Sequence, residues 1–172
     1  MKVVFLGIGT NLGDREANLM ESVQKVNEYI GHTVQASSVY ETEPWGFNSE
    51  DLFLNMVLNV ETELDAAEIL EKIRIIESVF GRNRDEAAYS SRVIDIDILL
   101  IGSLVMNERD LEIPHPHLHE RMFVLVPLCE IAPGIIHPVF KRSIAELLKL
   151  CNDRGRVRIY QPLDKGFTSL LH

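Results

Sequence analysis

Apolar residues recur at two different spacings along the chain, and the alternation of these spacings predicts a mixed α+β fold. Residues 2–9 form an apolar run that is typical of a short buried strand. Residues 52–62 alternate, so that Leu54 and Met56 share one face while Phe53 and Asn55 share the other. Two other segments carry apolar residues at helical spacing. These residues are Leu19, Val23, Val26 and Ile30 in the first segment, and Ile69, Ile73, Ile76 and Phe80 in the second.

Capping residues set the limits of these two predicted helices. Asp14 is a suitable N-cap for the first helix, and Asp65 with Glu68 three residues later has the pattern of a capping box for the second. Gly31 and Gly81 follow the last apolar positions, where glycine commonly ends a helix.

The remaining segments complete a sheet and add C-terminal helices. We expect further strands over 33–41, 93–101 and 111–113, helices over 118–131 and 143–151, and an extra strand over 157–160. The order strand, helix, strand, strand, helix, strand predicts a ferredoxin-like antiparallel sheet with a β-α-β-β-α-β core and its helices on one face. The other sheet face would then be partly free for a site.

Length and charge narrow the class of protein. The 172 residues predict a single domain, with a core over about 1–150 and a tail over 155–172 whose role the sequence does not indicate. The net charge of −9 argues against nucleic acid as a partner, because phosphate backbones require a basic face. A membrane is not expected as a partner either, because no stretch reaches the roughly 20 apolar residues of a span.

The cysteines and the N-terminus bear on location. Cys129 and Cys151 have no metal-ligand spacing and form no disulfide framework. The apolar run at the N-terminus is too short for the core of a signal peptide. We therefore expect a cytoplasmic protein, and we expect it to be a monomer.

Asp95 and Asp97 interrupt an otherwise apolar predicted strand. Residues two apart on a strand project from the same face, with Cα atoms roughly 6–7 Å apart. Two like charges placed in this way repel each other and lose hydration unless something offsets the cost. A bridging divalent cation would do so, and hard oxygen ligands suit Mg²⁺. The alternative is a pair of solvated aspartates on an exposed sheet face.

Three arginines flank the loop before this strand. Arg82 and Arg84 follow the second predicted helix, and Arg92 precedes the two aspartates. In so acidic a chain they favour a polyphosphate clamp, because guanidinium groups bind phosphate oxygens bidentately. The alternative is loop solubility, with salt bridges to Asp85 and Glu86.

Two other patterns narrow the chemistry. The segment from Gly7 to Gly13 has Leu12 where a dinucleotide fingerprint requires glycine, and no Walker A Lys-Ser/Thr pair follows a glycine run. These glycines instead predict close backbone packing and a tight turn. The histidines around Pro116 match no standard zinc site, which favours a turn that offers the imidazole of His115 to an anion.

Seven short motifs occur in one register between residue 3 and about residue 150. They are Gly-Thr-Asn-Leu-Gly-Asp at 9–14, Ser-Ser-Val-Tyr-Glu-Thr-Glu-Pro at 37–44, Phe-Leu-Asn at 53–55, Arg-Val-Ile-Asp-Ile-Asp-Ile-Leu at 92–99, Ile-Pro-His-Pro at 113–116, Arg-Met-Phe-Val-Leu at 121–125 and Pro-Leu-Cys-Glu-Ile-Ala-Pro at 127–133. Each motif is modest, but the ordered combination is specific. It resembles the 6-hydroxymethyl-7,8-dihydropterin pyrophosphokinases of folate biosynthesis.

The resemblance implies an ATP-dependent diphosphotransferase. ATP would give its terminal pyrophosphate to the hydroxyl of 6-hydroxymethyl-7,8-dihydropterin, and AMP would leave. Asp95 and Asp97 would hold two Mg²⁺ ions, and with Arg82 and Arg92 they would be the catalytic residues. The residues implied to contact the nucleotide are Arg82, Arg84, Arg92, Ile98 and His115. No general base is implied.

The resemblance also implies a pterin site. Phe53 and Phe123 would sandwich the flat ring, because planar heteroaromatics stack well between aromatic side chains. Asn55 and groups around Thr42, Pro44 and Trp45 would read the hydrogen-bonding edge of the ring. The polar loops at 44–51 and 82–92 would close as lids over the substrates.

Three positions depart from the family pattern. Residue 53 is Phe where the family often has Tyr, so stacking is retained and a hydroxyl contact is lost. Tyr89 stands where well-studied members have Trp, and Pro116 stands where an aromatic residue can occur.

Two other classes of protein compete with this reading. A non-catalytic ferredoxin-like ligand-binding domain would not need paired aspartates beside an arginine loop. A nucleotidyl transferase that acts on nucleic acid is disfavoured by the acidic chain and by the lack of a basic face.

Overall fold

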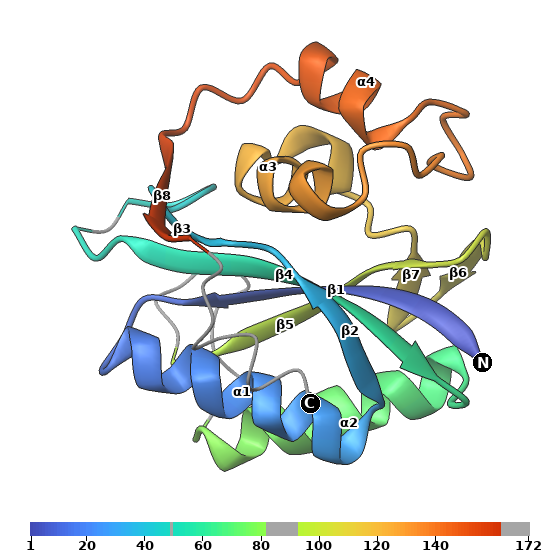
Figure 1. Ribbon diagram of the computed structural model, residues 1–172, viewed down its shortest axis with the longest axis horizontal. Coiled ribbons are helices and arrows are strands. Elements are labelled where there is room, and N and C mark those ends of the chain that lie inside the picture. The colour runs from blue at the N-terminus through green and yellow to red at the C-terminus, as the bar shows by residue number, and fades with distance from the viewer. Residues whose placement is uncertain (49, 82–92, 163–172) are drawn as a thin grey trace.

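Figure 1 shows the computed structural model of the chain, which describes residues 1–48, 50–81 and 93–162. Its elements in chain order are β1 (Lys2–Thr10), α1 (Arg15–Tyr29), β2 (His32–Ala36), β3 (Val39–Thr42), β4 (Phe53–Thr62), α2 (Ala66–Val79), β5 (Asp95–Ile101), β6 (Met106–Glu108), β7 (Leu111–Ile113), a 3-10 turn η1 (Leu118–Glu120), α3 (Met122–Ile131), α4 (Ile144–Leu150) and β8 (Val157–Gln161).

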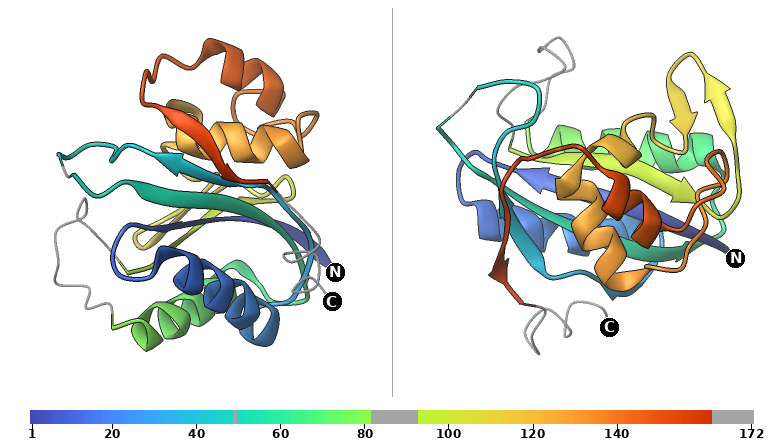
Figure 2. Two further views of the ribbon diagram at one scale, coloured as in Figure 1. Left: turned by 60° about the vertical axis from the view of Figure 1, so that its left-hand side comes forward. Right: turned by 90° about the horizontal axis from the view of Figure 1, so that it is seen from above.

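One antiparallel sheet of six strands runs through the middle of the molecule. The strand order is β5-β1-β4-β3-β8, and β2 also pairs with β4. Helices α1 and α2 cover one face of the sheet, whereas α3 and α4 lie over the other (Figures 1 and 2). The predicted ferredoxin-like α+β fold is confirmed, and the added C-terminal helices lie opposite the first two. Strands β6 and β7 form a separate hairpin.

The first two helices begin as their sequences predict. The side chain of Asp14 accepts a hydrogen bond from the Ala17 amide at 3.0 Å. Asp65 and Glu68 form a reciprocal capping box, so two amides that the helix cannot pair internally are satisfied. None of the helices in the described ranges has the length and apolar character needed to cross a bilayer.

The face beneath α1 and α2 is a continuous apolar core. Alternate residues of the central strands point into it, and the helices meet them with the apolar stripes read from the sequence. Its buried strand residues include Val4, Leu6, Ile8, Leu54, Met56, Leu58, Ile96 and Ile98. Because alternate residues of each strand are buried in this core, the residues between them must lie on the opposite face of the sheet.

Two predicted elements are divided in the structure. The strand expected over 33–41 is two strands, because the Ser37 hydroxyl accepts a hydrogen bond from the Val57 amide at 2.9 Å in place of a main-chain partner. The helix expected over 118–131 is interrupted at Arg121, whose backbone is extended. Strand β6 was not predicted, while the extra strand near 157–160 is confirmed as β8 at the sheet edge.

Candidate active site

A pocket of about 360 Å³ opens on the sheet face that carries α3. The register of the central strands builds its floor. Asn55, Gly9 and Asp95 lie side by side across β4, β1 and β5, and in the next row Gly7 lies beside Asp97. The two aspartates therefore share this face and line the pocket, as the period of the strand predicts.

The two strand glycines keep this floor open. A methyl group added at Gly9 would lie 2.7 Å from the Asn55 Oδ1 atom, whereas one at Gly7 would meet Leu99 at 3.4 Å. The close packing predicted for these glycines is therefore confirmed. The tight turn falls farther along, at Gly13, where φ is +70°.

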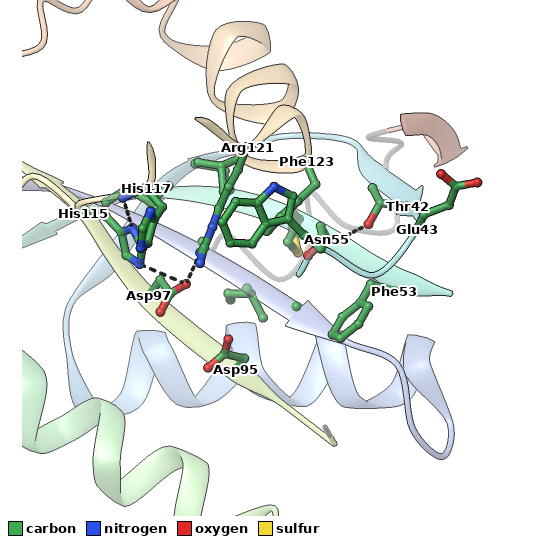
Figure 3. Close-up of a pocket in the computed structure, with 18 of the residues that line it drawn as sticks. Thr42, Glu43, Phe53, Asn55, Asp95, Asp97, His115, His117, Arg121 and Phe123 are labelled. Carbon is green, nitrogen blue, oxygen red and sulfur yellow. Dashed lines mark hydrogen bonds and ion pairs between the residues drawn. The ribbon is translucent and has the colours of Figure 1, made fainter. Parts of the chain in front are cut away.

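Asp97 lies at one end of the pocket, facing two nitrogen-bearing side chains. Its Oδ2 atom is 3.6 Å from His115 Nε2 and 3.6 Å from Arg121 Nη1 (Figure 3). Asp95 projects beside Asp97 from the same strand. This end of the pocket thus combines two carboxylates with a guanidinium and an imidazole, which suits a ligand made of a cation and phosphate groups.

His115 is held as a neutral imidazole. Burial, together with the positive charge of Arg121 and nearby His117, lowers its pKa to about 4, while Asp95 acts in the opposite direction. Its Nδ1 atom accepts a hydrogen bond from the His117 amide at 3.1 Å. The remaining proton therefore sits on Nε2, and His115 meets an anion as a hydrogen-bond donor without a full charge.

Arg121 is the central residue that the sequence interpretation missed. Its side chain is only 8% exposed, and its guanidinium lies 4.5 Å from the centre of the Trp45 ring and 5.6 Å from that of Phe123. Stacking of this kind stabilises a cation in a desolvated site. One signal in the sequence could have indicated it. Arg121 is a charged residue within the segment predicted to be a single helix, between the apolar residues Leu118 and Val124.

The other end of the pocket brings together most of the residues expected to bind the pterin (Figure 3). Thr42, Trp45, Phe53, Asn55 and Phe123 all line it. Asn55 donates a hydrogen bond from Nδ2 to Thr42 Oγ1 at 2.6 Å, so its amide is already oriented. Phe53 contacts Phe47 edge to face, with ring centres 6.1 Å apart. Glu43 also lines the pocket, and the sequence interpretation had not singled it out.

Two predicted contact residues do not line the pocket. Pro44 is absent from its walls, although its neighbours on both sides are present. The Ile98 side chain is 6% exposed and lies in the core beneath α1 and α2, because its position on β5 points away from the pocket. Only the main chain of Ile98 is therefore available to a nucleotide.

The predicted arginine loop lies outside the described residues. Arg82, Arg84, Tyr89 and Arg92 all fall within residues 82–92. The phosphate clamp therefore stays a prediction, as does the closure of that segment. In the sequence, Arg92 precedes Asp95, the first residue of β5, by three positions.

The carboxylates fit a magnesium site by their chemistry. Mg²⁺ is commonly held by one or two carboxylates, with substrate phosphates and water completing six oxygen ligands. Asp95 and Asp97 supply such a pair inside a pocket that also offers phosphate-binding donors. Among the residues that the structure describes, no group of three His, Cys, Asp or Glu side chains forms a metal cluster by itself.

Comparison with known sequences gives one consistent family. Residues 5–133 match the family described as 7,8-dihydro-6-hydroxymethylpterin-pyrophosphokinase (HPPK). The 2-amino-4-hydroxy-6-hydroxymethyldihydropteridine pyrophosphokinase of Aquifex aeolicus is 39% identical over 146 residues, which cover 85% of this chain and 90% of that protein. The enzyme of the same name from Methylorubrum extorquens is 41% identical over 160 residues, which cover 92% and 99%.

Solved structures share the fold. An HPPK-DHPS crystal structure in complex with substrates superposes with a TM-score of 0.71 at 15% identity, covering 87% of this chain and 43% of the longer one. Wild-type Plasmodium falciparum HPPK-DHPS gives a TM-score of 0.69 at 18% identity, covering 87% and 44%. At these identities the likeness concerns the fold alone, and this chain spans less than half of those two proteins.

Proposed function

This chain belongs to the HPPK family, and we propose that the pocket between β1, β4, β5 and α3 is where it transfers pyrophosphate from ATP to 6-hydroxymethyl-7,8-dihydropterin. The chain is an enzyme of folate biosynthesis, a diphosphotransferase that carries out the pyrophosphokinase step. The observation that supports this site is that one pocket combines an acidic end with an aromatic end. Paired carboxylates lie at one end, and aromatic rings beside an oriented amide lie at the other.

The aromatic end is the proposed pterin site. Phe53 and Phe123 come from β4 and α3 and would hold the flat ring between them. Asn55 is fixed by its hydrogen bond to Thr42, so its carbonyl oxygen and remaining N–H can pair with the ring edge without first being ordered. Backbone groups near Trp45 would complete the recognition of that edge.

The acidic end is the proposed triphosphate site. Asp95 and Asp97 would hold two Mg²⁺ ions, which when bound would neutralise phosphate charge and orient the oxygens for in-line transfer. Arg121 and His115 already face Asp97, and each can donate hydrogen bonds to phosphate oxygens. Arg82, Arg84 and Arg92 would supply further charge from the segment before β5. The reaction then needs positioning and charge stabilisation more than a covalent catalyst.

The test is to identify the products. The enzyme is incubated with ATP, Mg²⁺ and 6-hydroxymethyl-7,8-dihydropterin, and nucleotides and pterins are separated by chromatography. AMP should accumulate in step with a pterin that carries a diphosphate. Stoichiometric ADP, or AMP formed at the same rate without the pterin, would overturn the proposal.

We further propose that the enzyme works as a monomer in the cytoplasm. The support for a monomer is that residues of one chain build both ends of the pocket. Sedimentation at micromolar concentration, with and without substrates, should give a single species near 19.6 kDa. Activity that rises with enzyme concentration more steeply than in proportion would contradict it.

A further inference from the structure

The C-terminal strand β8 contacts the connection between β3 and β4 at the end that borders the pocket. β8 lies beside β3 at the edge of the sheet (Figure 1). Its first residue, Val157, is paired with Thr42. Thr42 also pairs with Phe53 on its other side. One end of β3 is thus held between β8 and β4, the strand that carries the pocket residues Phe53 and Asn55.

A buried carboxylate joins β3 to β8. Glu41 is 6% exposed, and its Oε1 atom accepts hydrogen bonds from the guanidinium of Arg158, from Nε at 3.0 Å and from Nη2. These bonds hold the pKa of Glu41 below its usual value, although burial acts in the opposite direction, and Arg15 adds to the lowering. A charge as deeply buried as this one requires such partners.

Arg15 extends the same network to the far end of the connection. Its Nη1 atom lies 3.1 Å from Glu41 Oε2 and donates to the Leu52 carbonyl oxygen at 2.8 Å. Its guanidinium also lies 5.7 Å from the centre of the Tyr160 ring of β8. Leu52 directly precedes Phe53, the first residue of β4 and a residue that lines the pocket. Arg15 therefore anchors the chain at the start of β4.

A second pair of contacts holds the near end. The Arg156 amide donates to Glu43 Oε2 at 3.2 Å, the Glu43 amide donates to the Arg156 carbonyl oxygen at 3.4 Å, and Arg156 Nη2 lies 3.6 Å from Glu43 Oε1. Glu43 lines the pocket beside Thr42. Both ends of the β3–β4 connection are therefore anchored by groups outside the pocket.

We propose that β8 is a positioning element for the pterin, acting through Arg158 and Arg156 to fix the end of β3 before the substrate arrives. The inference rests on the proposed function, because it assigns the anchored edge to pterin recognition. None of these arginines touches the proposed substrate. They hold Glu41 and Glu43, these residues hold the strand end, and the strand end orients Thr42 and its hydrogen bond to Asn55. An edge that must be ordered when the substrate binds uses part of the binding free energy, so loss of this anchoring should weaken pterin binding.

Steady-state kinetics of Arg158→Ala, with each substrate varied in turn, test the proposal. The variant should fold, because Arg158 is 60% exposed and Arg15 still pairs with Glu41. The KM for the pterin should rise about tenfold, while kcat and the KM for ATP should change by less than about twofold. Arg158→Lys, which keeps the charge, should return the pterin KM toward the wild-type value.

Two further variants make the test specific. Arg156→Ala removes a side chain that is 73% exposed, so the protein should fold. The main-chain hydrogen bonds between residue 156 and Glu43 remain, and loss of the guanidinium's ion pair with Glu43 should raise the pterin KM about threefold. Arg142→Ala is the matched control, because Arg142 is exposed on the α3–α4 connection and belongs neither to this network nor to the pocket. It should leave every constant unchanged.

Equal rises in both KM values, or an unchanged pterin KM in Arg158→Ala and Arg156→Ala, would overturn the positioning role. A separate binding measurement distinguishes this outcome from failure of the proposed function. Trp45 is the only tryptophan of the chain and lines the pocket, so its fluorescence reports pterin binding without turnover. Wild-type protein that binds the pterin about tenfold more tightly than Arg158→Ala supports the positioning role even if no AMP is formed.

Discussion

The two faces of the central sheet are built from the same strands but have opposite characters. On β5, Ile96 and Ile98 point into the core beneath α1 and α2, while Asp95 and Asp97 point into the pocket. The first face is apolar along most of its length, with the buried carboxylate of Glu41 toward one edge. The second is apolar only beneath α3 and α4, where Leu99 packs, and becomes polar toward the start of β5.

Alternate residues of the single strand β5 therefore serve two purposes: one set stabilises the fold, and the other supplies the chemical groups of the pocket. The helix-covered face removes many apolar side chains from water, which is the main favourable term in folding. The pocket face instead places two carboxylates close together and buries the guanidinium of Arg121, so it contributes charge rather than apolar burial. Substitutions that act on one face are therefore expected to leave the other unaffected.

The largest expected effect is on turnover, from Asp97→Asn. The amide keeps the shape of the side chain but loses the charge that would hold the metal, so kcat should fall more than about a hundredfold. The free energy of unfolding should change by less than about 1 kcal/mol. AMP formation and urea denaturation measure the two quantities. The control is Asp110→Asn, because Asp110 forms an exposed surface ion pair with Arg74. It should change neither kcat nor the free energy of unfolding. A fully active Asp97→Asn enzyme would refute the metal assignment.

Substitution of the adjacent residue, Ile96, should instead lower stability and leave turnover nearly unchanged. Ile96→Ala leaves a cavity in the core and should lower the free energy of unfolding by about 2–5 kcal/mol, measured by urea denaturation. The folded fraction should keep its kcat within about threefold. Ile98→Val is a milder companion that should cost about 1 kcal/mol and leave the KM for ATP unchanged. A raised KM for ATP in Ile98→Val would show that the side chain itself contacts the nucleotide.

The connection between α3 and α4 can be tested through pH. His137 is buried, and its Nδ1 atom accepts hydrogen bonds from the Val139 and Phe140 amides at 3.3 Å each. Burial, aided by His119, lowers its pKa to about 4. Between pH 6.5 and 4 the unfolded chain binds a proton that the folded chain does not, so stability should fall as the pH falls.

The matched variant is His137→Asn, whose side-chain oxygen can accept the same two amides. Urea denaturation at pH 7.5 and 4.5 should show that wild type loses about 2–3 kcal/mol more than the variant over this interval. Equal losses would mean that His137 is protonated in the folded protein at pH 4.5. Pocket kinetics at pH 7.5 should be the same for both proteins.

The smallest expected effect compares the two floor glycines. A methyl group at Gly9 would force the Asn55 amide to move and break its bond to Thr42, so Gly9→Ala should raise the KM for the pterin about tenfold. Gly7→Ala adds the same group where it meets Leu99 at ordinary contact distance, so its effect on the pterin KM should be about twofold or less. Equal effects would show that the clash with Asn55 is not the cause.

Local signals in the sequence predicted the elements well. The capping box at Asp65 and Glu68 needs only residues three apart, and the shared face of Asp95 and Asp97 needs only the period of a strand. Sequence failed where a distant partner decides the local structure. The break at Ser37 depends on Val57 of another strand, and no propensity within residues 33–41 indicates it.

The sequence by itself determined most of the elements, the face of the sheet on which the aspartates lie, and the motif order that matches the family. Only the tertiary structure decided that Arg121 reaches Asp97 and stacks on Trp45, and that β8 holds the end of β3. The physical reason is that periodicity acts over a few residues, whereas these contacts depend on strand register and on where α3 packs. A shift of one residue in register would turn every side chain of a strand to the other face. The cross-strand contacts of the whole sheet therefore determine which residues line the pocket.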